Sequence, residues 1–123
     1  MLWGADYGKA LSAAKIGLCF LSKRNRDVYT RRCFEIPATG TLMLSEHSDE
    51  LGALFQEGIE ADYFRSPGEL AGKVRHYLDD EASRRRVAER GRARVISDGH
   101  DVDSRMRAML NDLPFRSPVR RPA

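Results

Sequence analysis

The chain has 123 residues, a formal net charge of +3, a hydrophobic content of 41% and a charged content of 32%, which predict one soluble globular domain with a modest core. No stretch approaches the roughly 20 consecutive apolar residues of a membrane-spanning helix. The first residues also lack the basic and apolar regions of a signal peptide, so we expect a cytoplasmic protein without a membrane span.

The first half of the chain predicts a βαβ unit. Helical spacing of apolar residues favours a helix over 6–15, and the continuous apolar run 16–21 is typical of a parallel strand covered on both faces. A polar loop, 22–29, leads to a second helix over 30–38 and a second strand over 41–45. This order of elements is characteristic of α/β folds.

Local signals set the ends of the second helix. Thr30 is a suitable N-cap residue, and Pro37 should end or bend the helix because it lacks an N–H group. Gly40 suits the left-handed conformation that closes a helix. Cys19 and Cys33 fall in a strand and a helix, where we expect two buried, reduced thiols, since no second pair is available to build a metal site.

The second half predicts one more strand and several helices. In order, these are a helix over 49–56 capped by Ser48 and closed by Gly58, a strand over 59–64, and helices over 66–78, 81–96 and 101–113. Ser66, Pro67 and Glu69 predict a capping box at the start of the third of these elements. We expect the last helix to face inward through Val102, Met106, Met109, Leu110 and Leu113. Residues 114–123, rich in proline and arginine, predict a disordered tail after a domain spanning 1–113.

These elements predict a partial Rossmann-like α/β fold with about three short parallel strands and a helical C-terminal end. In open α/β sheets a ligand lies where strand C-termini meet helix N-termini. Arg31 and Arg32 oppose the dipole of the helix that they begin, which is reasonable if an anion binds there. Glu35 follows one turn later.

The motif Thr-x-Arg-x-Phe-Glu-Ile-Pro-Ala-x-Gly at 30–40 resembles the nucleotide-sugar signature of CgeB-like (spore maturation type) glycosyltransferases. The similarity continues at 7–16 and 54–64 and covers roughly residues 5 to 113. The resemblance implies a GT-B enzyme, in which two Rossmann-like domains face each other across a cleft and no metal or cofactor is required. It also implies that this chain is the later, donor-binding part of the C-terminal domain, and that an N-terminal domain or a partner chain supplies the acceptor site.

By this resemblance, Glu35 binds the ribose hydroxyls of a nucleoside-diphosphate sugar; alternatively it is a surface glutamate paired with Arg31 or Arg32. Arg32 either binds a phosphate or forms an ion pair with Glu35, and Arg31 is expected to be solvated. Thr30 either caps its helix or contacts a phosphate. Asp27 stands where related enzymes carry a second glutamate, and this shorter acid puts a direct sugar contact in doubt.

Two other functions stay open: a non-catalytic module of the same fold that docks onto a partner chain, and a nucleic-acid binder that uses the arginine-rich helix 81–96. Acidic residues interrupt that arginine face and no aromatic residue lies among its arginines, so nucleic acid is not the expected partner. His100, which begins the last helix, is expected to cap or pack rather than to catalyse. The base, the sugar and the acceptor are not predicted.

Overall fold

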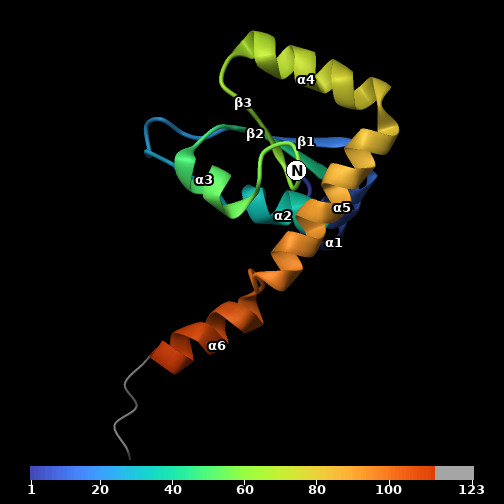
Figure 1. Ribbon diagram of the computed structural model, residues 1–123. Coiled ribbons are helices and arrows are strands. Elements are labelled where there is room, and N and C mark those ends of the chain that lie inside the picture. Colours follow the sequence, from blue (N-terminus) through green and yellow to red (C-terminus); the bar gives the residue numbers. More distant parts are fainter. Residues whose placement is uncertain (113–123) are drawn as a thin grey trace, which may run out of the picture.

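A computed structural model describes residues 1–112 and shows an α/β arrangement with one parallel sheet (Figure 1). The elements are α1 (Gly4–Ala13), β1 (Ile16–Cys19), α2 (Arg32–Ala38), β2 (Leu42–Glu46), α3 (Asp49–Leu54), β3 (Asp62–Phe64), α4 (Pro67–Asp79), α5 (Glu81–Ser97) and α6 (Val102–Asp112). The three strands lie in the order β1-β2-β3, and both pairings are parallel. The predicted fold class is therefore confirmed.

Two strands are shorter than predicted, because neighbouring backbone groups bond elsewhere. Strand β1 ends at Cys19, and the N–H of Leu21 donates to the Glu46 carboxylate instead of to a strand. Strand β3 begins only at Asp62, because the N–H groups of Ile59 and Glu60 both donate to the carbonyl oxygen of Gln56 and form a turn.

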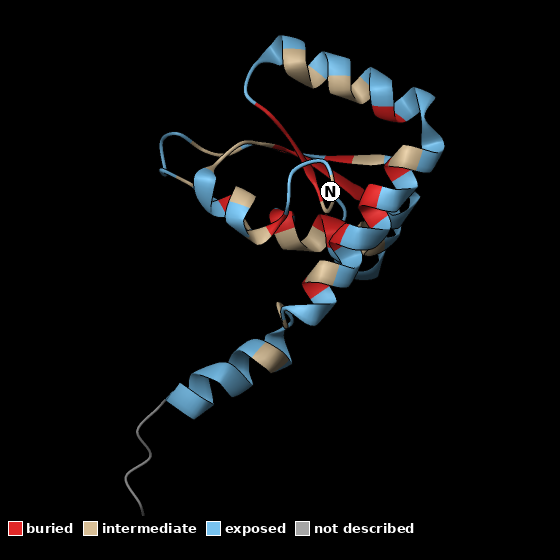
Figure 2. Ribbon diagram, viewed as in Figure 1, coloured by how far each residue is buried: buried red, intermediate tan, exposed pale blue. Residues whose placement is uncertain are grey.

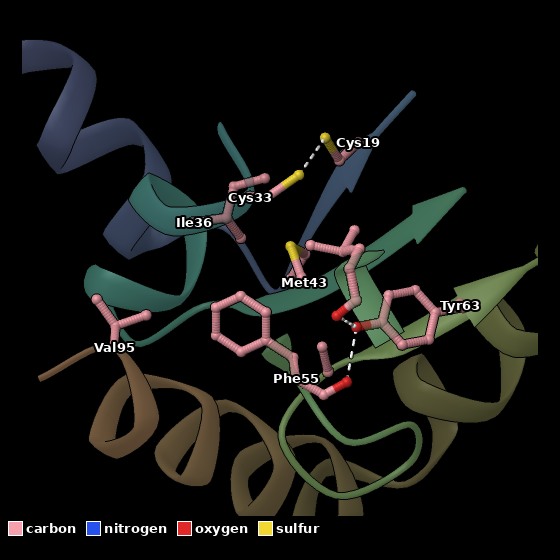
Figure 3. Packing of buried hydrophobic residues seen from close by; sticks show 9 residues of the cluster. Cys19, Cys33, Ile36, Met43, Phe55, Tyr63 and Val95 are labelled. Carbon is pink, nitrogen blue, oxygen red and sulfur yellow. Dashed lines mark hydrogen bonds between the residues drawn. The ribbon is translucent and has the colours of Figure 1, made fainter. Parts of the chain in front are cut away.

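The core lies on both faces of the sheet, with β2 buried at its centre (Figure 2). Successive strand side chains point to opposite faces. On one face, Met43 packs with Cys33 and Ile36 of α2 and with neighbours from α3 and α5 (Figure 3). On the other face, Leu42 packs with Tyr77 of α4 and with α5. Helix α2 is thus held between the sheet and α5.

Helix α2 begins at Arg32, later than predicted, and Thr30 does not cap it. Arg31 occupies the N-cap position and makes no side-chain cap bond. The Thr30 hydroxyl lies 3.6 Å from Cys19 Sγ instead, so the predicted capping role is wrong. Pro37 lies in the last turn and the helix ends one residue later, while Gly40 has φ +76° as predicted.

The two serine caps are confirmed, but the capping box closes differently. Ser48 Oγ accepts from the N–H of Leu51 at 3.1 Å. Ser66 Oγ accepts from the N–H of Glu69 at 3.1 Å, while the Glu69 carboxylate accepts from the N–H of Arg65 rather than from that of Ser66. Glu69 also lies near the Arg65 and Lys73 side chains, so it links the start of α4 to a cluster of charges.

Helix α6 does not face inward as predicted. It runs away from the sheet after Gly99, which has φ +64° (Figure 1). Its apolar side chains Val102, Met106, Met109 and Leu110 are all exposed. The spacing of these residues correctly predicted a helix. The expectation that this helix packs against the core is wrong, because none of its described residues is buried. Leu113 and the predicted tail 114–123 lie outside the described residues. Within residues 1–112, no helix has both the length and the apolar character needed to cross a membrane.

A buried tyrosine fixes α3 against the sheet. The Tyr63 hydroxyl lies 2.9 Å from the carbonyl oxygen of Leu51 and 2.7 Å from that of Phe55 (Figure 3). Replacing Tyr63 with phenylalanine leaves these carbonyl groups without the hydroxyl, so the free energy of unfolding should fall by about 1–3 kcal/mol. Denaturant unfolding measures this change. Tyr29→Phe, at a half-exposed ring, serves as the control and should change it by less than about 0.5 kcal/mol.

Candidate functional site

A cleft of about 860 Å³ opens between the residues around the start of α1 and the loop that joins β1 to α2. Its apolar lining residues include Met1, Leu2 and Trp3 before α1 and Phe20 directly after β1. Its polar wall, formed by the β1–α2 loop and the first turns of α2, includes Asp27, Thr30, Arg31, Arg32 and Glu35, which are the five residues singled out from the sequence. The fold therefore brings all the predicted site residues to one concave surface.

Glu35 is held at the cleft by two partners. Its Oε1 lies 2.7 Å from Nε of Arg31, and its Oε2 accepts from the Tyr7 hydroxyl at 3.1 Å. The ion pair is thus with Arg31 and not with Arg32. The Glu35 side chain stays 29% exposed, so its carboxylate is reachable from solvent. An ionised carboxylate has about four lone-pair sites, and these two contacts leave about two of them free.

Sequence reasoning missed the contribution of Tyr7. Its place in the helical spacing indicated only a helix, although it begins one of the segments that carry the family resemblance. Burial and the hydrogen bond to the Glu35 carboxylate raise the pKa of the Tyr7 hydroxyl. Tyr7 therefore keeps its proton and donates a hydrogen bond to Glu35, which fixes the orientation of the carboxylate from a different helix.

The two arginines differ in their pairing. Arg31 is 89% exposed, as expected for a solvated side chain, but it is also bound to Glu35. Among residues 1–112, Arg32 forms no ion pair, which leaves its guanidinium available to a ligand. The cleft therefore carries one cation already engaged by an acid and one that is not.

Asp27 shapes the loop that forms the polar wall. Its Oδ2 accepts from the N–H of Ser22 at 3.3 Å, and its own N–H donates to the carbonyl oxygen of Ser22 at 3.0 Å. Arg26 within this turn has φ 55°. The Asp27 side chain thus stabilises its own loop, which is a structural role and not a contact with a sugar.

The sequence profile of a family described as glycosyl transferase-like matches residues 1–111, nearly the whole chain. The chain belongs to this glycosyl transferase-like family. No curated protein and no solved structure matches it. Membership supports a glycosyltransferase-type function, and the three-stranded parallel sheet agrees with part of a Rossmann-like domain.

The glycosyl transferase-like domain has a pair of buried thiols next to Thr30, which lines the cleft. Cys19 and Cys33 are buried and free, as predicted, with their Sγ atoms 3.4 Å apart. The hydrogen bond between them lowers the pKa of the Cys19 thiol and raises that of the Cys33 thiol. Between residues 1 and 112, no three histidine, cysteine or acidic side chains gather where they could hold a metal ion.

His100 of this glycosyl transferase-like chain packs behind α2 and does not line the cleft. Its ring lies 4.6 Å from that of Phe34, and its Nδ1 is 2.9 Å from the Arg105 guanidinium. Burial and the nearby positive charge of Arg105 lower the pKa of His100. The neutral His100 ring therefore packs against Phe34, the residue that precedes Glu35, and this agrees with the expected packing role.

Proposed function

We propose that this chain binds the donor nucleotide sugar of a glycosyltransferase that resembles the CgeB-like enzymes. The observation that carries the proposal is the gathering of all five candidate residues on one cleft, with the Glu35 carboxylate accessible at its side. The cleft volume of about 860 Å³ is suitable for a ligand of nucleotide size.

The ribose is the group that Glu35 binds. Tyr7 and Arg31 each occupy one side of the carboxylate, and each oxygen keeps an acceptor position. Two neighbouring hydroxyl groups of a ribose can donate to these two positions. An ion pair with Arg31 therefore does not exclude ribose binding; it holds the carboxylate in one orientation beforehand.

The diphosphate lies against the arginines. A guanidinium group binds phosphate oxygens through two parallel N–H donors. Arg32 forms no ion pair among residues 1–112, and Arg31 lines the same cleft. During transfer, the acceptor oxygen becomes bonded to the anomeric carbon and its proton passes to a base of the acceptor site, while the bond from that carbon to the diphosphate oxygen breaks and the nucleoside diphosphate leaves. These cations stabilise the negative charge that grows on the leaving group.

The resemblance implies that a second Rossmann-like domain supplies the acceptor site. We therefore expect the 123-residue chain to bind a donor without transferring its sugar. Isothermal titration calorimetry with UDP-, GDP- and dTDP-sugars tests the proposal. Saturable binding of at least one of them supports it, and absence of binding for all three overturns it. Turnover by the isolated chain would refute the expectation of inactivity.

A docking module is the second candidate, because the outer edge of β1 has no strand partner among the described residues. Strand β1 pairs only with β2, and Leu18 of β1 is 43% exposed. A stable complex with another chain, without nucleotide binding, would favour this function. Nucleic-acid binding is disfavoured, since Arg84 and Arg85 of α5 both pair with Glu81.

A further inference from the structure

Two exposed aromatic side chains are among the residues that line the cleft. Trp3 is 76% exposed and Phe20 is 60% exposed, although aromatic rings of this size are usually covered in a folded domain. Neither ring belongs to the two clusters that form the core. Both rings share one cleft with the charged side chains of Arg31, Arg32 and Glu35.

We infer that Trp3, with Phe20 on the same cleft, is the stacking platform for the base of the bound nucleotide. This inference rests on the proposed function and adds to it the residue that contacts the base. The base of a nucleotide offers a flat aromatic face, and Trp3 offers an accessible one. Among residues 1–112, no side chain forms an aromatic pair with Trp3, so its ring faces are open to a ligand.

The cleft is lined by the two kinds of residue that a nucleotide needs, aromatic rings for the base and cations for the phosphates. The bond from Tyr7 to Glu35 joins α1, which Trp3 directly precedes, to α2, which begins with Arg32. We place a ribose bound at Glu35 where these two segments meet. Its base would extend toward Trp3, and its phosphates would extend toward Arg31 and Arg32.

The Phe20 ring is held in place from behind. Its centroid lies 5.5 Å from that of Phe64, with an angle of 64° between the two ring planes. Phe64 is buried at the end of β3, so this edge-to-face contact anchors Phe20 to the sheet. An anchored ring loses little conformational freedom when a ligand binds beside it.

The chain contains a single tryptophan, so its fluorescence reports on Trp3 alone. Titration with UDP and GDP should change the tryptophan emission, and the change should saturate at the same concentration as the calorimetric signal. Inorganic pyrophosphate and ribose 5-phosphate, which lack a base, should leave the emission nearly unchanged. Stacking tolerates different bases, so UDP and GDP should both produce the effect wherever both bind.

Variants separate stacking from folding. Trp3→Ala should weaken nucleoside-diphosphate binding about tenfold or more, while Trp3→Phe should retain most of the affinity because it keeps an aromatic face. Ile96→Ala, at a 64% exposed apolar residue of α5 outside the cleft, should leave the affinity unchanged. Affinity for pyrophosphate should be the same in all three variants.

The outcomes distinguish this inference from the function on which it rests. If calorimetry shows saturable binding, but the emission does not change and Trp3→Ala binds as tightly as the unmodified chain, the inference is wrong and donor binding stands. If no nucleoside diphosphate binds the unmodified chain, donor binding itself is wrong and the inference is overturned with it.

Discussion

Replacing Glu35 with alanine should weaken the binding of nucleoside diphosphates about 100-fold. Each of two hydroxyl groups that donate to a carboxylate contributes at least about 1.5 kcal/mol, and the loss of about 3 kcal/mol in total corresponds to roughly two orders of magnitude. Calorimetry measures the dissociation constant directly. Affinity for inorganic pyrophosphate should change little, because the arginines remain.

Controls show whether this loss is specific to the ribose contact. Glu50→Ala removes an exposed carboxylate of α3 outside the cleft, and it should bind nucleotide normally. The free energy of unfolding of Glu35→Ala should fall by no more than about 1 kcal/mol, since its ion pair with Arg31 is largely exposed to solvent. Unchanged nucleotide affinity in a folded Glu35→Ala variant would contradict the assigned role.

Replacing Gly91 with alanine should destabilise the domain by about 2 kcal/mol, although the same change in most helices is stabilising. Gly91 lies in the middle of α5, where an added methyl group would collide with the carbonyl oxygen of Glu60 and approach Cβ of Pro37 at 3.4 Å. The obstructing atom belongs to the backbone, so it cannot move aside cheaply. Because Pro37 belongs to α2, the displacement should also weaken nucleotide binding at Glu35.

Gly72 provides a matched control for this prediction. It lies inside α4, and nothing lies within 4 Å of the methyl group that alanine would add. Gly72→Ala should therefore stabilise the domain by about 1 kcal/mol. Denaturant unfolding of the two variants should give shifts of opposite sign. Stabilisation by Gly91→Ala would show that α5 does not press against Glu60 and α2 as described.

Much of the fold follows from local sequence, because hydrophobic runs and helix caps act over a few residues. The serine caps at Ser48 and Ser66 were predicted correctly. The strand containing Cys19 was also predicted, but it ends two residues early, and the expectation that both of its faces are covered is wrong, because Leu18 is exposed. Arg31 and Arg32, which the sequence singles out as a charged pair, line the cleft, and their role there stays a prediction. These signals need no knowledge of distant residues.

Contacts between distant segments could not be predicted from the sequence. The bond from Tyr7 to Glu35 joins residues 28 positions apart, and its existence depends on how α1 lies against α2. The Thr30 hydroxyl turns toward Cys19 instead of capping its own helix, since the strand brings a thiol close to it. The apolar stripe of α6, including Met106, predicted a buried face that the described fold does not cover.

Amide chemical-shift mapping of the whole chain, titrated with whichever nucleoside diphosphate binds in calorimetry, tests donor binding at this cleft most directly. We predict saturable shifts in the amides of Trp3, Tyr7 and residues 27–35, with little change in α4 or α6. Shifts that concentrate on another surface, while those amides remain unmoved, would show that the cleft around Glu35 is not where the nucleotide binds.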